Sequence, residues 1–374
     1  MHIVQISQVD AVFSGGSYPI EFLFYFKKGI DSGKIRKALR LAAPIFWPVF
    51  GRYQRGRIQF DGYREEDHYS EETVPLTFDP AGINENPLDT RGRFTQENPG
   101  GLFFLKILHF KNGSVLIPKM GHMVGDGYSY FYFLSALAAF ARTAIWHPSS
   151  LLYQTVFRPA HSRTAVRKFS FDGEETASPP AAPDLNIEVV HIPMLKVKRA
   201  VDEISASAQL RVSSNDLLSA MVLRKIADLR PDGFGDRIRL TFPMDVRRSV
   251  RKLGPRYFGN GIMFHHMEWP KDEILRLQPK ELAVEIRKAL PRLNRETFLR
   301  FLEEIEIIIQ AKNYTALRPF DPEAGCLVTN ISRLPADKLN FGGGAPSLIA
   351  PLTVGKNSAG ILRGGEDYIL QIVY

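Results

Sequence analysis

Cysteine is nearly absent from this sequence, which has Cys326 alone among 374 residues. One thiol cannot form an internal disulfide, and zinc or iron–sulfur sites built on cysteine need several thiolates. These are therefore excluded, and a reducing, cytoplasmic setting is indicated. Long apolar runs are absent too: the most apolar stretch, residues 128–141, is shorter than the ~20 residues that span a bilayer. The N-terminus shows no basic segment followed by an apolar run, so we expect neither export nor membrane attachment.

Several widespread catalytic signatures are also missing. The patterns G-x-x-x-x-G-K-[ST], G-x-S-x-G and H-E-x-x-H do not occur, which removes the usual signals of phosphate-binding loops, serine hydrolases and zinc proteases. Lys and Arg number 48 against 40 Asp and Glu, giving a net charge of +8. This charge is compatible with an anionic partner, but no nucleic-acid motif accompanies it. We therefore expect no binding of DNA or RNA.

Apolar residues, by contrast, are plentiful. They make up 44% of the chain, with 26 Phe and 13 Tyr, which is enough for two sizeable cores. At ~150 residues per domain, the length predicts two or three domains or one bilobed unit. Alternating and apolar runs predict strands at 3–6, 21–26, 57–63, 102–110, 114–119, 237–242, 261–267, 325–330, 348–354 and 368–373. Helical spacing predicts helices at 32–43, 127–143, 198–209, 215–229, 280–290 and 295–312.

One segment differs in composition from the rest. Residues 157–184 are rich in Pro, Ser, Ala and charge and lack apolar periodicity, which is typical of a linker. Strands and helices are mixed on both sides of it. We therefore predict an α/β (α+β) protein with an N-terminal lobe at 1–160, a crossover linker at 161–187 and a C-terminal lobe at 188–374.

The turn after the predicted strand 114–119 has the sequence MGHMVGDG, which places His122 four residues before Asp126 and next to Gly127 in that motif. Histidine takes up a proton near neutral pH, because its ordinary pKa is about 6.5. A nearby carboxylate can fix the ring tautomer or hold the loop, and spacing does not distinguish the two. His122 is thus either a catalytic base or a structural histidine beside a helix N-cap aspartate.

Further segments occur in a set order. SQVDAVF and WPVFGRY precede HMVGDG, and SSNDLLSAMVLRKIADLR, FPMDVRRSV, RYFGNGI and LVTNISRLPADKLNFGGGAP follow it. With HMVGDG as an HxxxDG motif, this set resembles the BAHD acyltransferases, within the superfamily of CoA-dependent acyltransferases and condensation domains. Gly121 stands where condensation domains have a second histidine, which favours the BAHD side. The resemblance implies two chloramphenicol-acetyltransferase-like lobes, each a mixed sheet with flanking helices, and an active-site channel between them.

The resemblance also implies a reaction. The family moves an acyl group from an acyl thioester, usually acyl-CoA, to a hydroxyl or amine of a small acceptor in secondary metabolism. His122 would be the general base. Asp126 would point away from the substrate and pair with Arg247, and Gly127 completes the motif. Thr329, in the VTN segment, would donate a hydrogen bond to the oxyanion, or would be an ordinary strand threonine.

The C-terminal motif departs from the family's DFGWG. Asn replaces its first acid and Gly its Trp, giving Asn340, Phe341, Gly342, Gly343 and Gly344. In the family this motif is mainly structural, so these residues are expected to support the fold. A missing indole would widen the channel or remove a donor near the oxyanion. The departure leaves open an alternative, a catalytically altered member that binds an acyl thioester or small molecule without transferring the acyl group.

Basic residues cluster after Arg247. Arg248, Arg251 and Lys252, with Arg256 beyond them, would attract the roughly four negative charges on the phosphates of CoA, or would form a solvated loop. We expect no permanently bound cofactor. Acyl-CoA, or an acyl carrier protein in its place, would be a co-substrate. We also expect a monomer.

Two remaining features favour structural interpretations. His265 and His266 are neighbours in a predicted strand, so their side chains point to opposite faces and a shared metal is not expected. Cys326 is either a nucleophile that forms an acyl-enzyme with help from His122 or, as we expect, a buried core residue.

Overall fold

The computed structural model describes residues 1–14, 19–85, 94, 101–143, 185–230, 233–250, 253–254, 257–353 and 355–374, without the side chains of 84 and 85. Its strands are β1 (His2–Gln5), β2 (Ile20–Phe26), β3 (Arg52–Gln54), β4 (Arg57–Phe60), β5 (Tyr69–Thr73), β6 (Phe103–Phe110), β7 (Gly113–Met120), β8 (Ile187–Pro193), β9 (Arg237–Asp245), β10 (Ile262–Pro270), β11 (Gly325–Asn330), β12 (Leu348–Pro351), β13 (Ser358–Gly364) and β14 (Asp367–Val373). Its α-helices are α1 (Gln8–Ala11), α2 (Ser32–Ala42), α3 (Gly82–Glu85), α5 (Gly127–Thr143), α7 (Met194–Ala208), α8 (Ser214–Leu229), α9 (Lys271–Arg276), α10 (Pro279–Ala289) and α11 (Arg295–Gln310).

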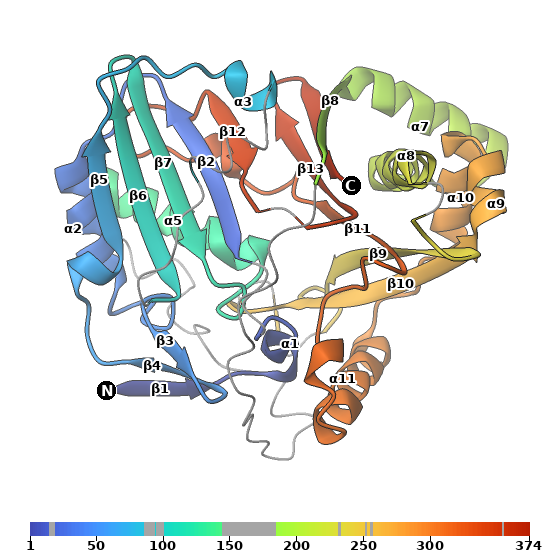
Figure 1. Ribbon diagram of the computed structural model, residues 1–374, viewed down its shortest axis with the longest axis horizontal. Coiled ribbons are helices and arrows are strands. Elements are labelled where there is room, and N and C mark those ends of the chain that lie inside the picture. Colours follow the sequence, from blue (N-terminus) through green and yellow to red (C-terminus); the bar gives the residue numbers. More distant parts are fainter. Residues whose placement is uncertain are drawn as a thin grey trace.

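The first lobe is built on a sheet with the strand order β12-β2-β7-β6-β5 (Figure 1). Successive side chains of β2 point to opposite faces. Phe22, Phe24 and Phe26 enter the larger core with residues of α2 and α5, whereas Leu23 and Tyr25 enter a smaller core on the other face. The sheet is therefore buried on both sides, which explains why β2 reads as a continuous apolar run.

Helix α5 is the most apolar helix predicted from the sequence, and it forms over the predicted residues. Its core-facing side chains include Tyr130, Phe131, Phe133 and Leu134, which pack against the first sheet and α2. No helix in the described ranges combines the length and apolar character needed to cross a membrane. The apolar sequence of α5 is accounted for by burial within the lobe.

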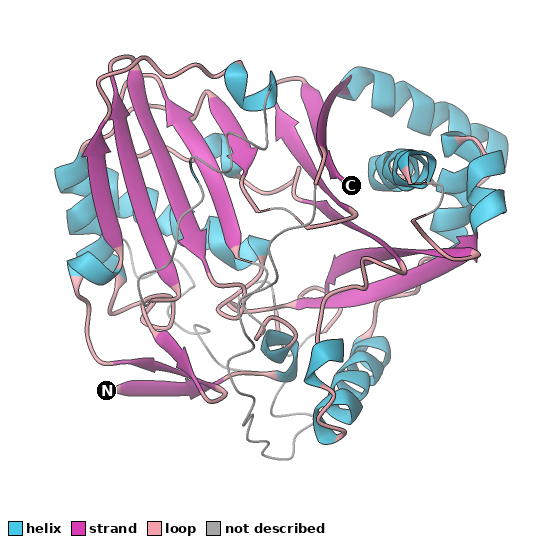
Figure 2. Cartoon of the chain, in the orientation of Figure 1, coloured by secondary structure: helices cyan, strands magenta, loops and turns pink. Residues whose placement is uncertain are grey.

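The second lobe is built on a sheet with the order β10-β9-β11-β13-β14-β8. Strands β11 and β13 run parallel, as do β11 and β9, while the other pairs are antiparallel. Helices α7, α8, α9 and α10 lie together beside this sheet (Figure 2) and share a separate core with it. This mixed sheet with flanking helices agrees with the predicted fold class.

One strand of the second half of the chain joins the first sheet. β12 comes from the second half of the chain, yet it pairs antiparallel with β2, with Leu348 opposite Tyr25 and Pro351 opposite Phe22. The chain then returns to the second sheet as β13. The range 188–374 thus contributes to both sheets. Of the expected linker at 161–187, all but the last three residues lie outside the described ranges.

Most predicted elements are present within a few residues of the expected bounds, but some strands were missed. β13 contains Gly360 and Gly364, which weaken a strand pattern, and it forms because β11 and β14 pair with it on either side. β8 follows the predicted linker directly and is held by β14. β14 follows β13 after two residues, but β11 for β13 and β14 for β8 are distant in sequence, so the local pattern reveals neither strand fully.

Candidate active site

The HMVGDG turn connects β7, which ends at Met120, to α5, which begins at Gly127. The N–H of Val124 donates to the carbonyl of Gly121 at 3.0 Å, which closes the turn. Asp126 accepts from the N–H of Ser129 at 3.1 Å, as a helix N-cap does. The turn thereby fixes His122 and Asp126 on the same short loop.

Asp126 is bound on all sides by hydrogen-bond donors. Arg247 Nη1 donates to Oδ2 at 2.8 Å and Nη2 to Oδ1 at 2.9 Å, so the guanidinium and carboxylate pair through two parallel bonds. The N–H of Gly261 adds a bond to Oδ2 at 2.9 Å, beside that from Ser129. Asp126 and Arg247 are both 2% exposed. The expected ion pair is present, and its carboxylate has no lone pair left for a shuttled proton.

Arg247 also holds the loop that follows it in the chain. Its Nε donates to the carbonyl of Tyr257 and its Nη2 to that of Gly259, both at 2.9 Å. The rings of Tyr128 and Tyr257 lie 4.6 and 5.7 Å from the guanidinium carbon, within cation–π range. In a buried setting these contacts tie the RYFGNGI segment to the HMVGDG turn.

His122 is partly exposed but surrounded by protein. Its ring stacks on Phe13 with centroids 3.7 Å apart, and its Nδ1 lies 3.2 Å from Asn260 Oδ1. Burial lowers the pKa of His122 to about 4, although Asp126 and the bond to Asn260 act in the opposite direction. The imidazole is therefore neutral at physiological pH, the state in which it can accept a proton.

Asn260 contacts two other groups besides the ring. Its Nδ2 donates to Asp10 Oδ1 and to the backbone carbonyl of His122, each at 2.8 Å. Asp10 closes a capping box with Ser7 at the start of α1. Burial raises the pKa of Asp10 to about 6, against the opposing effect of its hydrogen bonds. Neither residue was singled out as a site residue from the sequence, although each lies in a recognised segment, SQVDAVF or RYFGNGI.

Gly127 and the loop after β11 lie close together. A Cβ on Gly127 would be 3.3 Å from Leu334 Cδ1 and 3.9 Å from Ile331 Cγ2. Thr329 is on β11, two residues before Ile331, and is partly buried beside Gly360 of β13. The described contacts thus bring Ile331 to the start of α5, and the oxyanion role of Thr329 stays a prediction.

The NFGGG segment forms a tight turn. Asn340 Oδ1 accepts from the N–H groups of Gly342 and Gly344 at 2.8 and 3.2 Å, and Phe341 packs edge-on against Phe26. A Cβ on Gly343 would lie 2.5 Å from the carbonyl oxygen of Gly29, so only glycine fits without displacing backbone.

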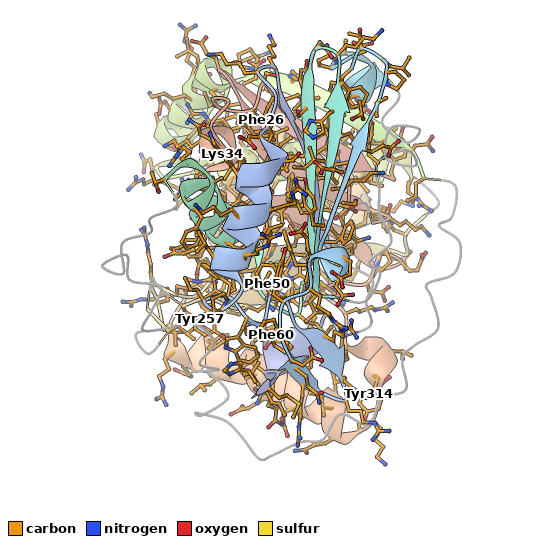
Figure 3. All side chains as sticks on the ribbon, turned by 90° about the vertical axis from the view of Figure 1, so that its left-hand side faces the viewer. Phe26, Lys34, Phe50, Phe60, Tyr257 and Tyr314 are labelled. Carbon is orange, nitrogen blue, oxygen red and sulfur yellow. The ribbon has the colours of Figure 1, made fainter. Side chains whose placement is uncertain are left out.

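This turn lies far from His122. Gly29 adjoins Ser114, at the opposite end of β7 from Met120, and at ~3.4 Å per residue the strand separates these ends by ~20 Å. Figure 3 likewise shows Phe26 in the upper part of the view and Tyr257 well below it. Gly343 thus meets the first sheet, and the effect of the missing indole on the channel or the oxyanion site stays a prediction.

The remaining residues considered from the sequence are the cysteine, the histidine pair and the basic run after Arg247. Cys326 is fully buried in the second core, and burial raises its thiol pKa to about 12, which keeps it protonated and unreactive at neutral pH. His266 Nδ1 shares a hydrogen bond of 2.9 Å with Thr241 Oγ1. No cluster of His, Cys, Asp or Glu in the described part of the chain is arranged to hold a metal. Arg248 is exposed, while Arg251, Lys252 and Arg256 lie outside the described residues.

The paired lobes, with a partly exposed histidine on the turn into α5, define the class. TRI101 of F. sporotrichioides, solved in complex with coenzyme A and T-2, has this fold: the TM-score is 0.76 at 13% identity, covering 99% of this chain and 94% of that one. Vinorine synthase gives a TM-score of 0.73 at 17% identity, covering 100% of this chain and 90% of that one. The architecture is that of the two-lobed CoA-dependent acyltransferases.

Sequence comparison supplies the family. Residues 90–367 match the Transferase family, and the chain belongs to it. The shikimate O-hydroxycinnamoyltransferase of Nicotiana tabacum is 25% identical over 398 residues, covering 97% of this chain and 88% of that protein. The chain is thus a BAHD-like, CoA-dependent acyltransferase, and the resemblance predicted from the ordered motifs is confirmed.

Proposed function

We propose that this chain transfers an acyl group from acyl-CoA to a hydroxyl or amine of a small acceptor, with His122 as general base. His122 removes the acceptor's proton as its oxygen or nitrogen bonds to the thioester carbonyl carbon. The tetrahedral intermediate collapses with cleavage of the C–S bond, and the same proton passes to the leaving sulfur. The products are the acylated acceptor and free CoA, so no further reactant is consumed.

The observation that carries this proposal is the state and setting of the His122 ring. It is neutral because burial lowers its pKa to about 4, and it is partly exposed, so that a ligand can approach it. Asp126 is committed to Arg247 and to backbone N–H groups. His122 is therefore the group in this turn that is free to exchange a proton, while Asp126 fixes the turn's shape.

Two further roles belong to the same proposal. Thr329 donates to the oxyanion that forms when the carbonyl is attacked. The basic run Arg248, Arg251 and Lys252 attracts the phosphates of CoA. That TRI101 was solved with coenzyme A supports CoA as the donor here. The tobacco relative's name, an O-acyltransferase, supports testing hydroxyl acceptors first.

The alternative is a protein that binds the thioester without transfer. The altered NFGGG segment suggests it, but that segment packs against Gly29, ~20 Å along β7 from the end that leads to the His122 turn. An altered residue there leaves the reacting groups in place. Transfer is therefore the better-supported function.

The test is release of free thiol. The protein is incubated with a panel of acyl-CoAs and with hydroxyl or amine acceptors, and thiol is followed with a chromogenic disulfide while mass spectrometry identifies the product. Acceptor-dependent thiol release with a matching acylated product supports transfer. Saturable acyl-CoA binding without such release across the panel, including acylated carrier proteins as donors, favours the binding protein instead.

A further inference from the structure

We propose that Asn260, held in place by Asp10, is a positioning residue that fixes His122 as the Nδ1-protonated tautomer, so that Nε2 carries the lone pair used in catalysis. This inference rests on the proposed role of His122 as general base. Asn260 of the RYFGNGI segment and Asp10 of the SQVDAVF segment would together orient the His122 ring.

The orientation of the Asn260 amide follows from its neighbours. Its Nδ2 lies 2.8 Å from Asp10 Oδ1 and 2.8 Å from the carbonyl oxygen of His122. Both neighbours are acceptors, so a flipped amide would place Asn260 Oδ1 against two oxygens and lose both bonds. The amide oxygen must therefore face the histidine ring.

The tautomer of His122 follows from that orientation. Asn260 Oδ1 can only accept, and it lies 3.2 Å from His122 Nδ1. The bond exists only if Nδ1 carries the hydrogen, which leaves Nε2 unprotonated in the neutral ring. Phe13 stacks on the ring face at 3.7 Å and resists a ring flip that would exchange the two nitrogens.

The backbone on either side of Asn260 is also fixed. Gly259 N–H donates to Ser129 Oγ at 3.0 Å, and Gly261 N–H donates to Asp126 Oδ2 at 2.9 Å. A Cβ on Gly261 would lie 2.6 Å from Arg247 Cζ, which shows how tightly the guanidinium covers this backbone. Asn260 itself has no exposed surface. The Asp126–Arg247 pair therefore holds the backbone of Asn260, and Asn260 in turn contacts the His122 ring.

The same contacts persist through the reaction. When Nε2 takes the acceptor's proton, the ring becomes a cation that still donates from Nδ1 to Asn260 Oδ1. The opposite end of the amide donates to the Asp10 carboxylate, so the amide dipole and that carboxylate stabilise the positive ring. The proton then leaves Nε2 for the CoA sulfur. No proton moves to Asn260 or Asp10, so their role is positioning.

The decisive readout needs no substrate. Protein labelled with 15N-histidine is compared with the His122→Ala variant to assign His122 by NMR. The expected spectrum has a protonated Nδ1 and an unprotonated Nε2 for the neutral ring. A protonated Nε2 in the wild-type protein overturns the inference. Since this result is independent of turnover, it is separable from failure of the general-base proposal, which would appear as full activity in His122→Ala.

Kinetics give a second test with matched variants. Asn260→Leu removes both the acceptor and the donors. We expect kcat to fall ~10- to 100-fold, the loss seen when a metal-binding histidine loses its orienting partner, with KM nearly unchanged. Asn313→Leu, at an exposed asparagine, is the control and should keep wild-type kcat. An unchanged kcat and tautomer in a folded Asn260→Leu protein contradict the role.

A double variant, Asp10→Asn with Asn260→Asp, swaps the two side chains and tests the contribution of Asp10. It also provides a test if the Asn260→Leu protein does not fold. Asn260→Asp alone keeps an acceptor for His122 Nδ1 but faces Asp10 with a second carboxylate. Adding Asp10→Asn restores a donor between the two positions, so the double variant should regain part of the kcat lost in Asn260→Asp. A double variant no more active than Asn260→Asp overturns the contribution of Asp10.

Discussion

Arg247 and Asp126, separated by 121 residues in the chain, are joined by two parallel hydrogen bonds of 2.8 and 2.9 Å in a setting where both side chains are buried. Replacing Arg247 leaves the Asp126 carboxylate buried without its opposite charge, and a lone buried charge destabilises the folded state. Arg247→Ala should lower the free energy of unfolding by about 3–5 kcal/mol, measured by denaturant unfolding.

The exposed neighbour Arg248 provides the matched control for that substitution. Arg248→Ala should change the free energy of unfolding by no more than about 0.5 kcal/mol, as surface substitutions usually do. If Arg247→Ala were as stable as Arg248→Ala, the ion pair would not hold the HMVGDG turn in the way described.

The pH dependence of catalysis follows from the pKa of His122. Burial lowers that pKa from its ordinary 6.5 to about 4, so the free enzyme keeps a neutral base well into the acid range. The acid limb of kcat/KM should therefore fall between about pH 4 and 5 rather than near 6.5. The measurement is kcat/KM against pH with unfolding checked at each pH. A limb at 6.5 with the protein folded would contradict the lowered pKa of His122.

Asp10 and His122 affect stability in opposite directions as the pH falls. Between pH 6.5 and 4 the unfolded chain binds the His122 proton that the folded chain refuses, so acidification destabilises the fold. Between pH 6 and 3.8 the folded chain protonates Asp10 first, so acidification stabilises it. The two effects oppose each other over the shared range.

Asp10→Asn should therefore remove the stabilisation that Asp10 provides on acidification and leave the destabilisation caused by His122. Its free energy of unfolding should drop more steeply than that of the wild type as the pH is lowered from 6.5 to 4, by chemical denaturation at each pH. Equal slopes for the two proteins would show that Asp10 ionises as an exposed carboxyl does.

Gly343 tests the structural role of the NFGGG turn. A Cβ there would lie 2.5 Å from the carbonyl oxygen of Gly29, so Gly343→Ala should destabilise the protein by about 1–3 kcal/mol, as overpacking does. kcat and KM should be unchanged, since the turn lies ~20 Å along the sheet from the His122 turn. Gly235→Ala is the control, because a Cβ at Gly235 meets nothing within 4 Å. A Gly343→Ala protein of normal stability but low kcat would place the turn at the active site after all.

The sequence predicted the parts of the fold that are encoded locally. The HMVGDG turn could be placed because a strong strand pattern precedes it and a strong helix pattern follows it. The bonds from Asn260 to His122 and Asp10 span 138 and 250 residues, so spacing alone gave no sign of them. The ordered motifs contained both residues, but only the fold brings them to one ring.

The position of Gly343 also depends on distant partners. The motif was expected to support the fold, and the pairing of β12 with β2 carries it to the end of the first sheet near Gly29. Partners in other elements, such as Gly29, decide where a loop lies. A chain read on its own does not reveal such partners.

Turnover of His122→Ala tests most directly whether His122 carries the proton in acyl transfer. With an acyl-CoA and acceptor that the wild type converts, kcat should fall by ~10²- to 10⁴-fold while the unfolding midpoint stays near that of the wild type. A folded His122→Ala protein that turns over at the wild-type rate would contradict the assignment of the base.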